Sequence, residues 1–342
     1  MKRYDIINIF LAELPLQLLT ANHMINSIEE LKRRKNLLIT TLDIKSNNCY
    51  DDIIECHNIN QKYFDRKNKK NIERLIEKIK LITIDYNEIY VFLPGIRNVL
   101  GNSLYKLFIK TENNKKCYFC VLPEGNYSLY LQKQTCMDIF KMWLKVLLGK
   151  IGFCPYTSYY GDKVGISNAQ ILYSFMPEMI TFFNGKVKKI PSFRRKENKK
   201  IIYGNNEKKF IFLGQPIEQG MKKKWKEKIN ETANFIKSNY NHYELYYKKH
   251  PRENINLVGN IFKKYGFKML EDNRAIEEII LNDDSYKIVC SYWCSALINL
   301  KLIFGKDIEC LAYKGLEFYC LAQNERDTLL KIYNYLGVKY IK

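Results

Sequence analysis

Short apolar runs alternate with longer segments of helical periodicity along this chain, and this alternation constrains the fold more than any other feature. The run "YDIINIFLA" is followed by "LQLLTANHMINSIEELKRRK", "NLLITTLDI" by "NIERLIEKIKLI", and "EIYVFLPG" by "NVLGNSLYKLFIK". Strands that alternate with helices form mostly parallel sheets whose faces the helices cover. We therefore expect an α/β fold.

The composition changes between Gly185 and Lys209, where Lys, Arg and Asn dominate the sequence. After this stretch the alternation restarts with "FIFLGQP", "KKWKEKINETANFIKSNY" and "YELYYKKHP". A chain of 342 residues suits two α/β domains of about 150 residues each. The sequence thus predicts an N-terminal domain over 1–190, a basic linker over 191–209 and a C-terminal domain over 210–342, with a central cleft between the domains that would bind the substrate. The last helix is free to pack back on the N-terminal domain.

The formal charge of +20 limits the classes of partner. Nucleic acid, an anionic membrane surface and a phosphate-bearing substrate all suit so basic a chain. The lysines are spread over helical segments and the linker, and no recognisable nucleic-acid module occurs, so we expect no nucleic-acid partner. Nucleic-acid binding remains a rival class of function.

Ten cysteines are scattered over the chain, which favours the reduced thiols of a cytoplasmic protein over a disulfide framework. Cys117 and Cys120 lie in the apolar run "KKCYFCVLPEG" without a second pair at zinc-finger spacing, so buried strand thiols are favoured over metal ligands. No uninterrupted apolar run reaches the ~18 residues of a membrane-spanning helix.

Three stretches of the second unit, "FLGQPIEQG", "YYKKHPRE" and "CSYWCSALIN", each follow a predicted strand. Because the carboxyl ends of parallel strands share one edge of a sheet, the three loops should converge on one pocket. Hydrogen-bond donors and cations dominate there, and a predicted helix begins near Ser295, so we expect a phosphate group bound without an obligatory metal. The loops supply Gly214, Gln215, Glu218, Lys248, Lys249, His250, Arg252, Ser291 and Ser295.

Each of these stretches also has a plain structural interpretation. A His-Pro pair such as His250-Pro251 is usually a turn, because proline restricts the residue before it and lacks an N–H. Ser291 and Ser295 can cap a helix, and adjacent lysines are often solvated.

The spaced set "LPLQLL", "FLGQPIEQG", "YYKKHPRE" and "SYWCSALIN", between Leu14 and Asn299, resembles the bacterial sialyltransferases of glycosyltransferase family 52, of the lipooligosaccharide and capsule type. It is more remotely similar to the bacterial polysialyltransferases. The resemblance implies a GT-B type fold of two Rossmann-like domains, an N-terminal acceptor domain, a C-terminal domain for CMP-sialic acid, inversion at the anomeric carbon and no metal cofactor. It is also compatible with a homodimer. The family's His-Pro motif maps onto His250 and Pro251, and its serine-rich motif onto Ser291 to Ser295, where Cys294 interrupts the double serine.

The expected chemistry suits these residues. Sialyl transfer breaks the bond between the anomeric carbon and the phosphate of CMP, so negative charge builds on the leaving phosphate. His250 can stabilise that charge by donating a hydrogen bond or by acting as a general acid. Neighbouring lysines oppose its protonation, which favours hydrogen-bond donation. The expected donor-binding residues are Gly214, Gln215, Lys248, Pro251, Arg252, Ser291 and Ser295.

An inverting transfer also needs a base for the acceptor hydroxyl, and related bacterial sialyltransferases use an acidic pair followed by glycine. "PEGNYSLY" with Glu124 and "IEQG" with Glu218 resemble that motif, although Pro123 and Gln219 each occupy an acidic position. Glu124 is the favoured base, because it follows an apolar strand of the first domain and so can face His250 across the cleft. Glu218 is the alternative.

The segment "FKMWLKVLLGKIGF", Phe140 to Phe153, mixes large apolar residues with three lysines. A basic amphipathic stretch can lie on an anionic membrane surface, which suits an enzyme that modifies a lipid-linked glycan at the inner face of the cell membrane. The more usual explanation is a core helix with a solvated lysine edge. A third class of function, a glycosyltransferase with another nucleotide sugar, stays open, although no Asp-x-Asp motif occurs.

Overall fold

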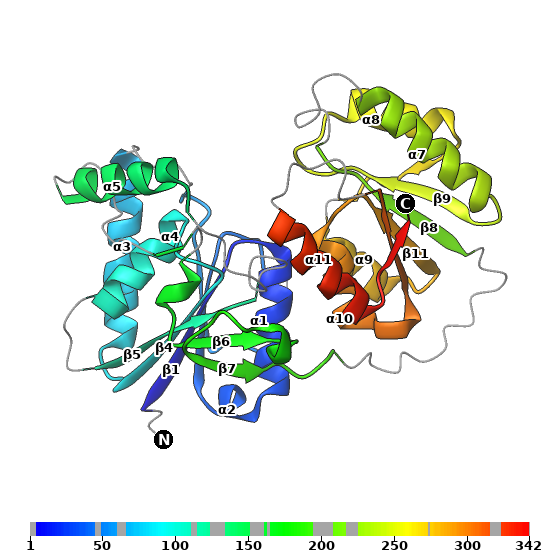
Figure 1. Ribbon diagram of the computed structural model, residues 1–342. Helices are drawn as coiled ribbons and strands as arrows, with labels where there is room; N and C mark the ends of the chain where they lie inside the picture. Colours follow the sequence, from blue (N-terminus) through cyan, green and yellow to red (C-terminus); the bar gives the residue numbers. More distant parts are fainter. Residues whose placement is uncertain are drawn as a thin grey trace. The chain divides into compact units, whose positions relative to one another are not determined.

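The computed structural model of the chain forms two compact units, Met1–Pro191 and Ser192–Lys342, each with its own sheet (Figure 1). The structure describes residues 5–44, 49–59, 66–110, 115–123, 134–150, 161–162, 165–193, 208–216, 225–272, 274–314 and 323–341. Each unit is treated by itself below.

The first unit contains a parallel sheet whose described strands have the order β3-β2-β1-β4-β5-β6-β7. The order reverses between β1 and β4, which makes their carboxyl ends the switch point of this sheet. The strands are β1 (Ile6–Ala12), β2 (Lys35–Thr40), β3 (Asp52–Glu55), β4 (Glu88–Leu93), β5 (Lys116–Val121), β6 (Ile171–Ser174) and β7 (Lys186–Lys189).

The helices of the first unit follow the predicted alternation, with one interruption. The long helix expected after the first strand divides at Ile28, whose backbone is extended (φ −108°, ψ 107°). Pro15 is the first residue of the helix, where its missing N–H leaves no intrahelical hydrogen bond unmade. The helices are α1 (Pro15–Ser27), α2 (Glu29–Lys32), α3 (Arg66–Thr83), α4 (Val99–Tyr105) with a π-helical turn (Lys106–Lys110), α5 (Cys136–Lys150), and the 3₁₀ turns Ile166–Asn168 and Pro177–Met179.

The apolar residues of the strands form the core of this unit, where the rings of Phe10 and Phe92 stack with their centroids 4.3 Å apart. Cys117 and Cys120 lie in β5, as the apolar run predicted. Their spacing in a strand directs them to opposite faces of the sheet, and Cys120 is buried while Cys117 is half-buried. The described residues contain no group of three or more His, Cys, Asp or Glu side chains that could hold a metal ion.

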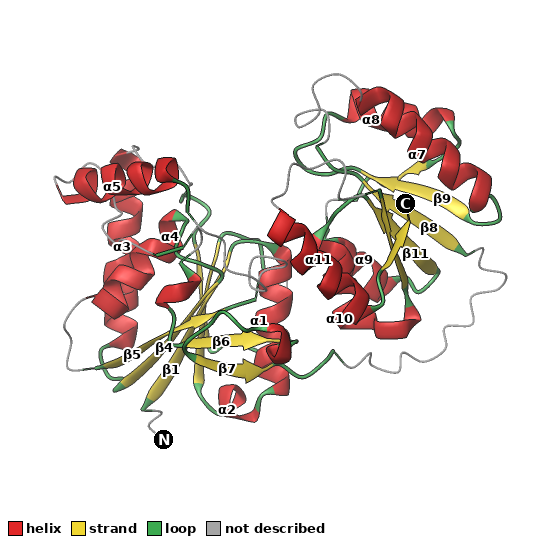
Figure 2. Cartoon of the chain, viewed as in Figure 1, coloured by secondary structure: helices red, strands yellow, loops and turns green. Residues whose placement is uncertain are grey.

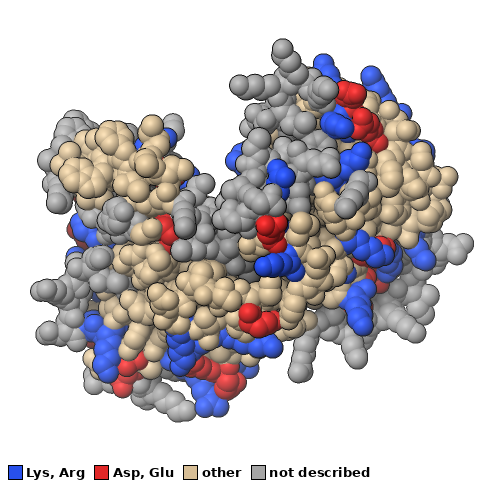
Figure 3. All heavy atoms as spheres, in the orientation of Figure 1, with Lys and Arg blue, Asp and Glu red and all other residues tan. Residues whose placement is uncertain are grey.

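Helix α5 presents an unusually apolar surface, and the space-filling view shows it largely tan (Figure 3). Met142 is its one fully buried large apolar side chain among those described, whereas Phe140 and Trp143 are each 66% exposed. The explanation of this segment as a core helix is therefore wrong. The exposed large apolar side chains of α5 are Met137, Ile139, Phe140, Trp143, Leu144 and Leu147.

The second unit contains a parallel sheet with the order β10-β9-β8-β11-β12-β13 (Figure 2). In chain order this is 3-2-1-4-5-6, the arrangement of the doubly wound nucleotide-binding fold, with its switch point between β8 and β11. The strands are β8 (Lys209–Leu213), β9 (Glu244–Lys248), β10 (Lys268–Met269), β11 (Tyr286–Ser291), β12 (Glu309–Tyr313) and β13 (Lys339–Ile341).

An aromatic core supports this sheet, with the rings of Phe212, Tyr247 and Phe262 packed together at centroid distances of 4.3 to 6.1 Å. The last helix, α11, contacts α10 and β13 of its own unit. The helices are α7 (Trp225–Asn239), α8 (Ile255–Lys264), α9 (Ile276–Asn282), α10 (Ser295–Phe304) with a 3₁₀ turn (Gly305–Asp307), and α11 (Gln323–Leu336). None of the described helices of either unit is long and apolar enough to span a membrane.

Candidate functional site

The three predicted loops begin side by side at the switch point of the second sheet. β8 lies between β9 and β11, and the register pairs Leu213 with both Lys248 and Ser291. The N–H of Gly214 donates to the carbonyl of Lys248 at 2.8 Å. The three strands therefore end at the same level, so their loops start from one edge of the sheet.

The loop after β9 is a tight turn that holds the ring of His250. The N–H of Glu253 donates to the carbonyl of His250 at 3.0 Å, with Pro251 at the second position of the turn, where its fixed φ is favourable. The N–H of Arg252 donates to Nδ1 of His250 at 3.1 Å. A donor there requires a lone pair on Nδ1, so the neutral ring carries its proton on Nε2. The turn interpretation of the His-Pro pair is thus correct, and this turn also defines the donor atom of the imidazole.

Glu253 is the last residue of this turn and was not singled out by the sequence analysis. Its side chain is buried, and its Oε1 accepts a hydrogen bond of 2.5 Å from the hydroxyl of Tyr247. Its Oε2 accepts the N–H of His250 at 3.3 Å. A Cβ atom on Gly214 would overlap both Glu253 Oε2 and the Tyr247 hydroxyl, so only glycine fits there without a shift of these atoms.

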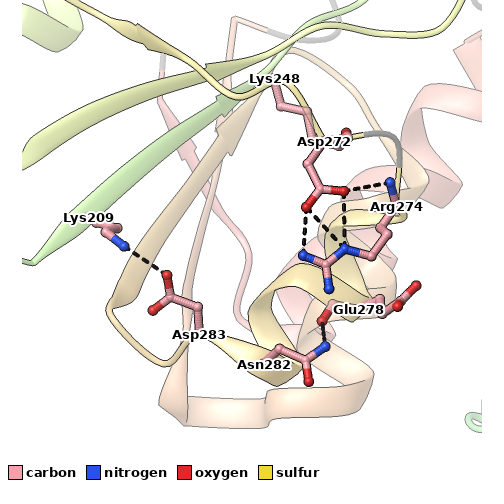
Figure 4. A network of polar contacts seen from close by, with 7 residues as sticks. All are labelled: Lys209, Lys248, Asp272, Arg274, Glu278, Asn282 and Asp283. Carbon is pink, nitrogen blue, oxygen red and sulfur yellow. Dashed lines mark hydrogen bonds and ion pairs between the residues drawn. The ribbon is translucent and has the colours of Figure 1, made fainter. Parts of the chain in front are cut away.

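Lys248 is half-buried, and its ammonium donates to the carbonyl of Asp272 in the loop after β10. Burial lowers the pKa of Lys248, and the carboxylate of Asp272 opposes this shift. The side chain of Arg274 pairs with that carboxylate at 2.6 Å (Figure 4), and its hydrogen bonds lower the pKa of Asp272 to about 2. Lys248 is therefore held against the loop after β10, whereas Lys249 is exposed, as its solvated interpretation predicts.

The loop after β11 leads directly into α10. Ser291 is fully buried, and its hydroxyl donates to the carbonyl of Leu213 at 3.0 Å. Cys294 is the N-cap of α10, and its Sγ accepts the N–H of Ala296 at 3.4 Å. Burial raises the pKa of Cys294 to about 11, so the thiol remains neutral. The capping role considered for Ser291 and Ser295 is thus filled by Cys294.

Ser295 is the first residue of α10 and is partly exposed. The positive dipole end of this helix lies at the switch point and favours an anion. Behind it, the buried carboxyl of Glu277 accepts a hydrogen bond of 3.0 Å from the side chain of Asn299, and burial raises the pKa of Glu277. The sequence analysis had no signal for this residue.

The remaining predicted residues divide into two groups. Gln215 is partly exposed after β8, and Pro251 and Arg252 are exposed in the turn. Glu124 and Glu218, the two candidates for the base, lie outside the described residues.

Two α/β units with parallel sheets, the second with cations and donors at its switch point, define a glycosyltransferase fold of the GT-B type. The structure resembles that of a sialyltransferase from Photobacterium damselae, residues 113–497 corresponding to its GT-B domain, with a TM-score of 0.53, 13% identity, and coverage of 98% of this chain and 100% of that one. It also resembles the alpha/beta-galactoside alpha-2,3-sialyltransferase of the luminous marine bacterium Photobacterium phosphoreum, with a TM-score of 0.55, 12% identity and coverage of 98% of each chain. The predicted fold class is confirmed.

The chain belongs to the alpha-2,8-polysialyltransferase (POLYST) family, whose model matches residues 8–312. It is accordingly a glycosyltransferase of the sialyltransferase class. The expected resemblance to bacterial sialyltransferases is confirmed, and the matching family is the one to which the sequence analysis assigned the more remote similarity. No curated protein sequence matches the chain significantly.

Proposed function

We propose that the protein is an inverting, metal-independent sialyltransferase that moves sialic acid from CMP-sialic acid to a terminal sugar hydroxyl of a bacterial surface glycan, either lipooligosaccharide or capsule. The observation that carries this proposal is the gathering of His250, Lys248 and the N-terminus of α10 at the switch point of the second sheet. Each of these groups favours a phosphate.

The donor phosphate would lie against the first turn of α10, where the positive end of the helix dipole attracts it and the Ser295 hydroxyl donates a hydrogen bond. Lys248 and Arg252 would supply positive charge from the β9 side, while Gly214 and Gln215 border the site from the β8 side. Pro251 sets the turn that carries His250. Ser291 supports the site from beneath, because its hydroxyl is committed to the Leu213 carbonyl.

During transfer the bond between the anomeric carbon and the phosphate oxygen breaks, and its electron pair remains on CMP. The proton on Nε2 of His250 would form a hydrogen bond to that oxygen, which strengthens as negative charge develops. Cations and N–H donors at this edge provide the positive potential that the leaving phosphate needs. This supports transfer without an obligatory metal, which activity in the presence of EDTA would test.

The base for the acceptor hydroxyl would be Glu124 or Glu218. Glu124 remains the favoured candidate, because it follows β5 of the first unit, which would bind the acceptor. The second unit, with the site at its switch point, would bind CMP-sialic acid.

Calorimetric titration with CMP in the absence of metal, on the wild type and His250→Ala, tests this function. Saturable binding that His250→Ala weakens supports the placement of the phosphate at this turn. A wild type that binds UDP but not CMP would point to another nucleotide sugar. No binding to either nucleotide, together with salt-dependent retention on DNA, would overturn the proposal in favour of nucleic-acid binding.

We also propose that α5 places the protein on an anionic lipid bilayer at the cytoplasmic face of the membrane. Six large apolar side chains of this helix are exposed, and Lys141 and Lys145 accompany them, in a chain of net charge +20. An interfacial helix combines such an apolar face with basic residues that attract anionic lipids.

Co-sedimentation with vesicles of phosphatidylglycerol and phosphatidylcholine tests the bilayer proposal. Phe140→Ser with Trp143→Ser should reduce binding, whereas the matched control Leu81→Ser with Ile84→Ser, which removes equally exposed apolar side chains outside α5, should not. The proposal is refuted if the wild type does not bind anionic vesicles at low salt. Light scattering of the same samples would reveal a homodimer and would show whether α5 is instead covered by a second copy.

A further inference from the structure

Glu253 lies in the turn after β9, beside Gly214 at the start of the loop after β8, and it is buried. A buried carboxylate is costly unless hydrogen-bond donors meet it. Here both oxygens are met, Oε1 by the hydroxyl of Tyr247 and Oε2 by the N–H of His250. A carboxylate with both oxygens hydrogen-bonded, next to an aromatic core, fixes the geometry of the groups that it binds.

The part attached to it is the His250–Glu253 turn. The carboxylate binds the N–H of His250, and the backbone N–H of Glu253 binds the carbonyl of the same residue, so the turn is closed from both sides. This arrangement places the N–H of Arg252 on Nδ1 of the imidazole. Any loosening of the turn would free Nδ1 and let the ring exchange between its two neutral tautomers.

We propose that Glu253 is the positioning residue of His250, which it holds with the proton on Nε2 and with the ring in one orientation. The proposal rests on the function proposed for His250 and deepens it. Glu253 acts through shape and through two acceptor atoms, so its negative charge is not required. An amide at this position can still accept the His250 N–H, while its NH₂ group donates to the Tyr247 hydroxyl, which is also an acceptor.

A substitution at Gly214 tests the contact between the Glu253 carboxylate and the turn in a second, independent way. Because Glu253 Oε2 fills the space that a side chain at position 214 would need, Gly214→Ala should push the carboxylate away from the turn. Removal of that carboxylate relieves one of the two overlaps and leaves the overlap with Tyr247. Gly214→Ala should therefore lower kcat less in the Glu253→Ala background than in the wild type.

The experiment compares Glu253→Ala, Glu253→Gln and Tyr265→Phe. Tyr265→Phe is the matched control, because it removes another tyrosine hydroxyl bond, to Asn230, from a ring that packs against the same core. The readouts are kcat and KM for CMP-sialic acid, the Tm, and the tautomer of His250 from two-bond ¹H–¹⁵N spectra of histidine-labelled protein. His250→Ala assigns the resonances, since the chain has four histidines.

We expect Glu253→Ala to lower kcat on the order of tenfold or more, with KM little changed, and to turn the pure Nε2–H tautomer into a mixture. Glu253→Gln should restore both, and Tyr265→Phe should leave both as in the wild type. The proposal is overturned if Glu253→Ala keeps the wild-type tautomer and the wild-type kcat. It is also overturned if Glu253→Gln is folded but loses as much kcat as Glu253→Ala. If the wild type transfers no sialic acid, the function fails, but the tautomer readout still decides the role of Glu253.

Discussion

The backbone N–H of Arg252 donates to Nδ1 of His250, so the imidazole and the proline turn form one hydrogen-bonded unit. Glutamine at position 250 places an amide close to the former Nε2, whereas asparagine places it close to Nδ1. We therefore expect His250→Gln to retain more sialyl transfer than His250→Asn, and His250→Ala to lose about 10²-fold or more in kcat. Initial rates of transfer from CMP-sialic acid compare the three variants with the wild type. Equal activity of the Gln and Asn variants would contradict hydrogen-bond donation from Nε2.

The two serines of the β11 loop should behave differently, because one is fully buried and the other begins α10. Ser291→Ala removes the bond to the Leu213 carbonyl and should lower the free energy of unfolding by about 1 kcal/mol, with little change in CMP affinity. Ser295→Ala should weaken CMP binding roughly threefold to tenfold and leave stability unchanged. Urea denaturation and calorimetry on the same preparations separate the two effects. Weaker CMP binding in both variants would place Ser291 in contact with the donor.

Glu277→Gln should stabilise the protein increasingly as the pH rises. Burial raises the pKa of Glu277 above its ordinary value of 4.5, so the folded state holds this proton more tightly than the unfolded state. The wild type therefore loses stability as the pH rises from 4.5 through the folded pKa, and a glutamine, which keeps the bond to Asn299, does not.

Thermal unfolding between pH 4.5 and pH 8 checks this sign, with Glu278→Gln, at the partly exposed neighbouring position, as the control. A difference between Glu277→Gln and the wild type that shrinks with rising pH would contradict it. The positive charge of Lys248 lowers the pKa of Glu277 and so reduces the size of the effect.

Glu124→Gln and Glu218→Gln, measured side by side, decide which carboxylate takes the proton of the acceptor hydroxyl. Loss of the base should reduce kcat by about 10²-fold or more at neutral pH, because general-base catalysis contributes that much. CMP affinity should stay close to the wild-type value in the base variant. Near-normal turnover of both variants would place the base on another residue.

Strands β8, β9 and β11 of the second unit were predicted because burial in a sheet leaves a local pattern, whereas the short strands β10 and β13 were missed. The run "YELYY" alternates as β9 requires, with Leu245 and Tyr247 buried and Tyr246 half-buried. Strand β3 was missed, because its residues Asp52–Glu55 begin and end with acids and lack a long apolar run. The division of the first long helix at Ile28 was also missed, since an apolar residue there continues the helical pattern.

The supporting residues of the site were harder to predict, because their roles depend on partners distant in sequence. Glu253 is buried because Gly214 leaves space for its carboxylate. Cys294 caps α10 where serine is the usual residue. Likewise, the apolar residues of α5 have the spacing of a core helix, and no local pattern shows that the rest of the first unit leaves them uncovered.

The strand order of the second unit also determines when its site can appear as the chain is synthesised. β8 is made first, but β11, its neighbour across the switch point, follows only after β9, β10 and the described helices α7, α8 and α9. Non-local parallel pairing is slow to form, because the intervening loop must close before any contact rewards it. A nascent chain therefore exposes one edge of β8 until residue 291 has left the ribosome, and during that interval this edge is open to pairing with a second copy.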